Sequence, residues 1–224
     1  MKVNNRIVGG IREACAHDSA VKHVTGKAVY IDDIPEPKNT LHLSLGMSEI
    51  AKGKIKSINL DDVNSSSGVV GTLLASDIPG VNDFSPTHSG DDLVLADNYI
   101  EFAGQPIFAV IAESYGQART AAKLGKIQYV SSPPLLTISE AIEGNSFVSD
   151  SYTLKRGNVD EEMDKAKLKT SGSLVIGGQE HFYLEGQVAF VIPKEDNEMI
   201  VYSSTQHPSE TQQLIGKMLN QKSN

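Results

Sequence analysis

The sequence predicts a mixed α+β fold, and three observations lead to this class. Short apolar runs recur along the chain, with the alternating or continuous character that indicates strands. Residues 105–130 follow the order strand, helix, strand, which is typical of an α/β unit. Residues from Pro208 onward have the apolar spacing of an amphipathic helix. The strand, helix and strand within about 27 residues place the chain in the α/β or α+β class.

The first part of the chain predicts strands at 41–47, 54–60 and 69–74. Alternation in the second of these places Ile55 and Ser57 on one face and Ile58 on the other. Asp61 suits the start of a short helix, because an aspartate there can accept hydrogen bonds from free backbone amides. The polar, turn-rich residues 81–98 are expected to form a solvated loop.

The middle of the chain carries the clearest strand–helix–strand signal. Residues 105–113 form the longest apolar strand of the first half, and residues 126–130 form the next strand. Ser114 is expected to cap the intervening helix and Gly125 to end it. The apolar side of that helix is expected to consist of Ala118, Ala121, Ala122 and Leu124.

The second part of the chain predicts a short helix at 136–142, a charged helix at 159–167, strands at 168–177, 187–193 and 198–204, and a helix from Pro208. The turn at 195–197 makes the last two strands a hairpin. The final helix carries an apolar stripe that requires a partner, formed by Leu214, Ile215, Met218 and Leu219. Prolines at 133 and 134 and polar residues near 150 indicate a linker. The expected division is an N-terminal arm at 1–25, an α/β domain at 26–135, a linker at 136–156 and a second domain at 157–224.

Composition excludes several classes of protein. A formal charge of −8 and a pI near 5.2 argue against nucleic-acid binding. No apolar run approaches the roughly 20 residues that span a bilayer, and the first residues lack a signal-peptide core. Cys15 is the only cysteine, so an internal disulfide, a cysteine-rich zinc site and an iron–sulfur cluster held within this chain are excluded. A soluble, cytoplasmic protein without membrane contact is expected.

Two groups of residues could suggest a metal site, and both have a simpler interpretation. His17 and His23 are six residues apart, a spacing that fits neither a helix face nor a strand face. Asp91 and Asp92, with His88 nearby, lack the spacing of a ligand set. Partly exposed imidazoles and a solvated loop are the favoured interpretations.

The segment 177–187, GGQEHFYLEGQ, is the most distinctive in the chain. It lies between Ser173–Ile176 and Val188–Ile192, two apolar runs that predict buried strands. Paired glycines at a strand end allow close approach of the backbone to another group or a positive φ. Gln179 then offers a neutral amide that both donates and accepts hydrogen bonds. On these grounds the segment is either a site for a polar ligand or a tight connection with ordinary surface residues.

Three long motifs resemble the molybdenum hydroxylase family, and among its members the molybdenum-binding subunits of the xanthine dehydrogenase type. They are residues 177–187, residues 17–33 (HDSAVKHVTGKAVYIDD) and residues 204–210 (STQHPSE), in the order in which the family has them. The resemblance implies a hammerhead-type α/β domain followed by the start of a molybdopterin-binding α+β domain. It also implies that Gln179 hydrogen-bonds an oxo ligand of molybdenum, with Gly178 and Phe182 beside the cofactor.

The activity implied by the resemblance is hydroxylation of hypoxanthine or xanthine to urate, with oxygen taken from water at Mo-molybdopterin. Electrons would pass to [2Fe-2S] centres and FAD on a partner chain and then to NAD. The family's substrate-binding arginine and general-base glutamate have no counterpart in this chain, so it is expected to contain no catalytic residue and to be inactive alone. Its expected partners are the FAD/iron–sulfur subunit, the rest of the molybdenum subunit and a purine substrate. An aldehyde oxidoreductase relative and a non-catalytic binding or assembly module are the alternatives.

Overall fold

The computed structural model describes residues 14–86, 90–183 and 185–222. Its contacts divide the chain into two compact units. One unit consists of residues 39–181 with 209–224, and the other of residues up to 38 with 182–208. The mixed α+β class predicted from the sequence is confirmed, because each unit combines short helices with a small antiparallel sheet.

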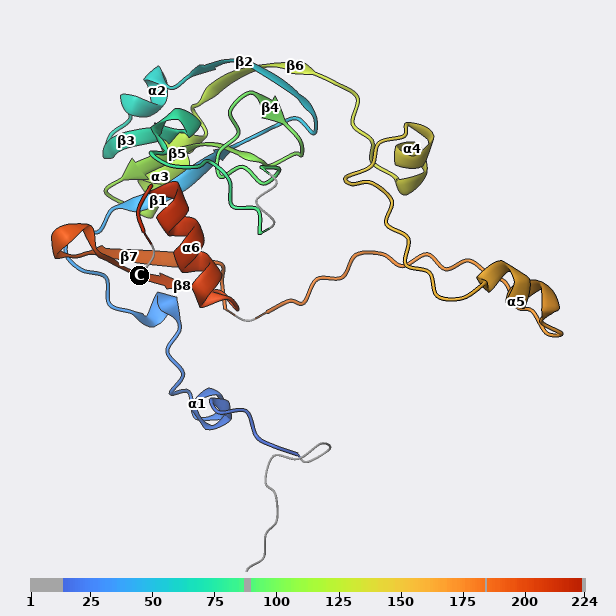
Figure 1. Cartoon of the computed structure of the whole chain (residues 1–224). Helices are drawn as coiled ribbons and strands as arrows, with labels where there is room; N and C mark the ends of the chain where they lie inside the picture. Colours follow the sequence, from blue (N-terminus) through green and yellow to red (C-terminus); the bar gives the residue numbers. More distant parts are fainter. Residues whose placement is uncertain (1–13, 87–89, 184, 223–224) are drawn as a thin grey trace, which may run out of the picture. The chain divides into compact units, whose positions relative to one another are not determined.

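The larger unit is built on two three-stranded antiparallel sheets (Figure 1). The first has the order β1 (His42–Met47), β5 (Pro106–Ala112), β3 (Val69–Leu74). The second has the order β4 (Tyr99–Ile100), β2 (Gly53–Asn59), β6 (Lys126–Ser131). Two short helices, α2 (Asp61–Asn64) and α3 (Tyr115–Ala122), and a 3-10 turn, η2, at Ala75–Asp77 lie between these strands in the sequence. The strands expected from alternation thus form close to their predicted bounds.

Strand β5 provides the centre of the hydrophobic core. Ile107, Phe108 and Val110 are at most 1% exposed. β5 lies between two strands, and α3 covers one of its faces with Ala118 and Ala121, which are fully buried. Ser114 caps α3 as predicted, because its hydroxyl accepts a hydrogen bond from the Gln117 amide over 3.4 Å. Leu124, which was assigned to the apolar side of this helix, is instead exposed beyond its end.

Strand β2 departs from the strict alternation expected for it. The register of β2 against β6 shifts between Ile55 and Ser57, as in a β-bulge. A bulge adds one residue to one strand and so reverses the alternation of faces beyond it. Ile55 and Ile58 therefore both pack against the core. In a regular strand, residues three positions apart would lie on opposite faces. Their predicted placement on opposite faces is wrong.

The loop that precedes β4 is not solvated throughout, as the sequence suggested. Asp83, Ser85 and Leu95 are buried within it. The Asn82 side chain holds its two halves together, since its amide nitrogen donates to the Leu95 carbonyl over 2.7 Å and its oxygen accepts from the Leu95 amide over 3.0 Å. Short polar side chains that bond the backbone make such a loop self-supporting. His88 lies outside the described residues.

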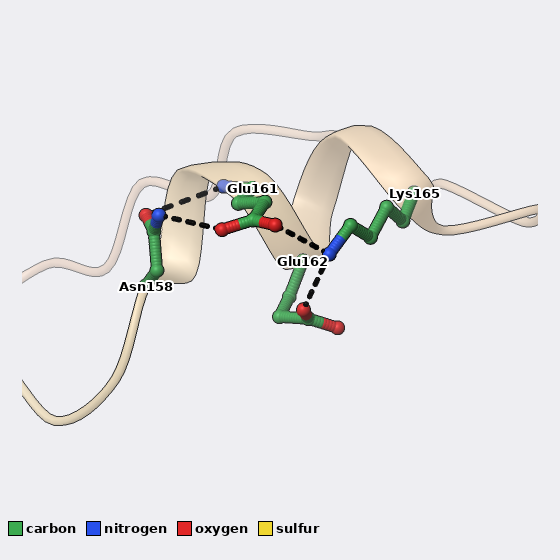
Figure 2. Close-up of polar contacts among 4 residues, drawn as sticks. All are labelled: Asn158, Glu161, Glu162 and Lys165. Carbon is green, nitrogen blue, oxygen red and sulfur yellow. Dashed lines mark hydrogen bonds and ion pairs between the residues drawn. The ribbon is translucent and has the colours of Figure 1, made fainter.

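Residues 132–181 contain two short helices and no strand. Helices α4 (Ile138–Glu143) and α5 (Val159–Lys165) have no buried residue. Figure 2 shows the polar contacts of α5, which confirm the expected charged and solvated helix. The strand predicted at 168–177 is absent, and Val175 within it is 96% exposed. No strand of the described residues lies beside this segment to bond its backbone, which a strand requires.

The smaller unit contains the hairpin of β7 (Ala189–Pro193) and β8 (Met199–Ser203), joined by the 3-10 turn η3 at Glu195–Asn197. It also contains α1 (Ala20–Val24) and the 3-10 turn η1 at Ile31–Asp33, so the expected extended arm includes one helical turn. The hairpin is confirmed, but β7 is only half-buried rather than buried. Phe190 and Tyr202 stack across it with ring centroids 6.0 Å apart.

Helix α6 (Pro208–Met218) follows β8 and starts at the expected proline. Its apolar stripe is half-buried, and Gly216 is its one buried residue. No helix of the described residues is long and apolar enough to cross a membrane.

Candidate functional site

The amino-terminal half of segment 177–187 is open and irregular. Residues 177–181 belong to no helix or strand, and the Gln179 side chain is exposed. Neither Gly177 nor Gly178 has a positive φ, and a methyl group added to either would meet no atom within 4 Å. The glycines are therefore not required by a turn or by a neighbour among the described residues. They leave the backbone beside Gln179 accessible to a large group.

The carboxy-terminal half of the segment is fixed by hydrogen bonds to the rest of its unit. The Ser204 hydroxyl donates to the Gly186 carbonyl over 3.0 Å and accepts from the Val188 amide over 3.1 Å. Glu185 accepts a longer bond of 3.4 Å from the Ile31 amide. Segment residues therefore contact the strand end after β8 and the turn η1, two regions that are distant in sequence.

Each of these regions carries one of the other two motifs quoted above. Residues 17–33 contain Ile31, and residues 204–210 begin at Ser204. The structure thus brings parts of all three motifs together within the smaller unit. Sequence reasoning did not identify Ser204 as a contact residue, and its place at the start of the third motif was the only available signal.

The aromatic residues of the segment behave differently from each other. Phe182 has a positive φ of 52° and is 93% exposed. Tyr183 accepts a hydrogen bond from the Gln187 side-chain amide, which is a contact within the segment. The predicted cofactor-binding residues Gly178, Gln179 and Phe182 thus lie in exposed parts of the segment.

The acidic and imidazole groups of the segment lie in different surroundings. Glu180 and His181 are exposed, and Glu185 is used in its bond to the Ile31 amide. Among the described residues no group of three or more histidine, cysteine, aspartate or glutamate side chains could hold a metal ion. The segment can therefore offer hydrogen bonds from an amide and from the backbone.

A cavity of about 350 Å³ lies in the larger unit, between β1, α3 and β6. Its lining includes Phe108 and Ile127, with Arg119 from α3 and Lys123 from the residue after that helix. Burial raises the pKa of the Tyr129 phenol, which also lines the cavity, above the ordinary 10.0. None of the lining residues belongs to segment 177–187, so the cavity is a separate feature.

Models of two protein domains match the chain. The hammerhead domain of aldehyde oxidase and xanthine dehydrogenase matches residues 25–133, and a molybdopterin cofactor-binding domain matches residues 140–224. The chain is 40% identical over 209 residues to xanthine dehydrogenase/oxidase of Gallus gallus, and 38% identical over 206 residues to aldehyde oxidase 4 of Mus musculus. These matches cover 93% and 91% of this chain and 15% of each relative.

A solved structure with a similar fold is the aldehyde oxidoreductase from Desulfovibrio gigas. The similarity has a TM-score of 0.79 at 21% identity and covers 92% of this chain and 25% of that one. At this identity the likeness shows the fold, and it agrees with a hammerhead domain followed by the start of a molybdopterin-binding domain. The similarity to the curated relatives shows more, and on that basis the chain belongs to the aldehyde oxidase and xanthine dehydrogenase family of molybdenum hydroxylases.

Proposed function

We propose that this chain is the N-terminal portion of the molybdenum-binding subunit of a xanthine dehydrogenase or aldehyde oxidase, and that its segment 177–187 contributes one wall of the cofactor site. The observation that carries the proposal is the contrast within that segment. Its glycine and glutamine end is open, while its other end is bonded to Ser204 and Ile31. Such a segment is anchored on one side and accessible on the other.

The residues present suit one contact with Mo-molybdopterin. The Gln179 amide is a neutral donor, so it can hydrogen-bond an oxo ligand without changing the net charge of the site. Gly178 leaves the backbone bare beside that amide, and Phe182 offers an exposed ring for packing. The bound group would supply the hydroxylation chemistry, while these residues bind and orient it. A single amide and two neighbours are too few to hold a cofactor of that size by themselves.

The chain spans about 15% of the length of its curated relatives. We therefore assign the activity to a longer protein or assembly. In that assembly the rest of the molybdenum subunit would complete the site, and [2Fe-2S] centres and FAD on a partner chain or domain would carry electrons to NAD. A cytoplasmic location belongs to the same proposal. The isolated chain would be inactive.

Two substrate classes remain in the proposal. A purine substrate, with hypoxanthine or xanthine oxidised to urate, would correspond to the relative from Gallus gallus. An aldehyde substrate would correspond to the relative from Mus musculus. The two identities, 40% and 38%, are too close to choose between them.

The first test is the molybdenum and pterin content of the purified 224-residue chain, measured by elemental analysis and by fluorescence of the oxidised pterin. We expect neither in a protein that circular dichroism shows to be folded. Stoichiometric molybdenum with pterin would overturn the statement that residues beyond this chain are needed to hold the cofactor.

The second test addresses Gln179 in a complete protein. A chimera in which this chain replaces the matching region of the Gallus gallus relative would be purified with and without Gln179→Ala. We expect the variant to lose molybdenum occupancy or turnover of xanthine, while Gln128→Ala, an exposed glutamine on β6, changes neither. Equal occupancy and turnover in the two variants would remove Gln179 from the proposed site.

A further inference from the structure

The C-terminal end of α6 lies against residues 80–83, which we call the 80–83 loop. The Gly80 amide donates to the Met218 carbonyl over 2.7 Å, and the Val81 amide donates to the Lys217 carbonyl over 3.2 Å. About 135 residues separate the partners in sequence, and this contact is unrelated to segment 177–187. The last carbonyls of a helix lack partners inside it, so such bonds satisfy groups that would otherwise need water.

The helix end shows why these bonds are needed. Asn220 takes a left-handed conformation with φ of 52°, and the chain turns back so that the Gln221 amide reaches the Gly216 carbonyl over 2.8 Å. This arrangement is a Schellman motif, which satisfies part of the helix end from within. The Met218 carbonyl accepts no hydrogen bond within that motif. It accepts one from the Gly80 amide instead.

Gly80 allows the close approach because it has no side chain. A methyl group at this position would overlap the Lys217 carbonyl oxygen and press on the Met218 carbonyl oxygen. Both are backbone atoms, so they cannot move aside as a flexible side chain would. Gly80 does not have a positive φ, so its own backbone conformation does not require glycine.

A charge pair reinforces the contact. The Lys217 ammonium lies 3.5 Å from the Asp83 carboxylate, whose side chain is 6% exposed. Asp83 also accepts a bond of 3.0 Å from the Ser85 amide. A lysine in the last turn of a helix also suits the negative end of the helix dipole. The pair therefore joins a buried anion of the loop to the end of the helix that tolerates a cation.

The 80–83 loop is held by its own domain as well as by the helix. The Asn82 side chain bonds both backbone groups of Leu95, and Leu95 is buried. These bonds lie wholly outside α6. The loop is therefore formed by residues of the hammerhead match, and α6 uses it as a binding surface.

We propose that the 80–83 loop is a docking site for the C-terminal end of α6, and that the order of α6 depends on this contact. The loop lies within the residues that match the hammerhead domain, and α6 lies within those that match the molybdopterin-binding domain. The contact therefore joins a helix of one family domain to the other domain. This agrees with the grouping of residues 209–224 with 39–181 in one compact unit. The inference goes beyond the proposed function and does not depend on a cofactor.

The test is amide hydrogen exchange of the whole chain, resolved at Leu219, Asn220 and Gln221 and at Val110 in β5. Gly80→Ala is expected to speed exchange at the helix end by about tenfold or more, since it blocks bonds to two helix carbonyls. Exchange at Val110 should stay within twofold of the parent, a margin of about 0.4 kcal/mol by the usual relation between free energy and equilibrium constants. Gly71→Ala is the matched control, because a methyl group there meets no atom within 4 Å.

Lys217→Gln gives a second, milder variant that adds no steric conflict. It should also speed exchange at the helix end, by about fivefold to tenfold, while Val110 is unchanged. Unchanged exchange at the helix end in both variants would overturn the proposal. An equal rise at Val110 and at the helix end would also overturn it, because the loop would then support the whole unit rather than dock the helix.

Discussion

Residues 106–112 and residues 168–177 each contain a run of apolar, branched side chains, and the two runs have opposite surroundings. Val110 in β5 is fully buried, whereas Val175 is 96% exposed. The difference lies in whether neighbouring strands are present to hydrogen-bond each backbone. β5 bonds β1 on one side and β3 on the other, and α3 covers it. The segment 168–177 has no strand beside it among the described residues. Apolar, branched residues therefore indicate that a segment can form a strand, and neighbouring strands decide whether it does.

The length of the family's members accounts for the open surroundings of the second region. The chain matches about 15% of the length of its relatives, so most of a family member has no counterpart in it. Under the proposed function, residues 168–177 would find their strand partners in that remainder. The hammerhead match, by contrast, carries its own core, with Ile107, Phe108 and Val110 at its centre.

Truncating Phe108 in the first region and Phe182, which follows the second region, gives the largest expected effect. Phe108→Ala should lower the free energy of unfolding by about 3–5 kcal/mol, because it removes a buried ring and leaves a cavity. Phe182→Ala, at a ring 93% exposed, should change it by less than about 0.5 kcal/mol. Urea denaturation at neutral pH measures both. Similar losses in the two variants would mean that Phe182 belongs to a packed core, and the comparison between regions would fail.

The pH dependence of stability can be compared in the same way for two carboxylates, those of Asp83 and Glu140. Hydrogen bonds from Ser85 and the charge of Lys217 hold the pKa of Asp83 below its usual value of 3.8. A group whose pKa is lower in the folded state stabilises the fold above its unfolded pKa, and the contribution is lost as pH falls through the folded value. Hydrogen bonds from Leu136 and Thr137 likewise lower the pKa of Glu140, whose carboxylate forms a capping box with the N-cap Thr137 at the start of α4.

Asp83→Asn should therefore reduce stability at pH 7 and flatten its decline between about pH 5 and pH 2, because its carboxylate is buried in the cooperative unit. Glu140→Gln should leave the curve for global unfolding unchanged, since α4 has no buried residue. Thermal unfolding measured across that pH range checks both. A flattened curve for Glu140→Gln alone would show that α4, and not the 80–83 loop, is coupled to the core.

Local signals predicted the hammerhead region well for a physical reason. The α3 cap at Ser114, the buried alanines of α3 and the apolar strand around Phe108 each depend on residues close in sequence. The β2 bulge could not be predicted, because Ile55 and Ile58 show their common face only when β6 is paired against them. The buried Asp83 likewise depends on Lys217, which is far away in sequence and gives no local signal.

The candidate site was predictable in a different sense. The motif around Gln179 was identified by its resemblance to a family, and its role stays a prediction because its surroundings in the structure are open. The contacts of Ser204 with Gly186 and Val188 could not be inferred from sequence, since a serine near a strand end is common. Under the proposed function, Gly178 and Phe182 would lie beside the bound cofactor.

The smallest expected effect tests whether α5, within the exposed residues 132–181, unfolds together with the core. In α5, the Lys165 ammonium lies 2.5 Å from the Glu161 carboxylate and 3.3 Å from that of Glu162, and Asn158 caps the helix (Figure 2). Such exposed pairs stabilise a helix by about 0.3–0.5 kcal/mol. Lys165→Ala should therefore speed amide exchange within α5 about twofold, and leave the urea midpoint of the whole chain unchanged.

The control for that measurement is a surface pair in the packed region. Lys126 on β6 lies 2.5 Å from the Asp62 carboxylate on α2, and both side chains are more than half exposed. Lys126→Ala should lower the urea midpoint slightly, because the pair joins two elements of the cooperative unit. A lowered midpoint for Lys165→Ala as well would mean that α5 unfolds together with the core. The exposed segment around it would then be held by contacts to that core, and the explanation through a longer family protein would lose its main structural support.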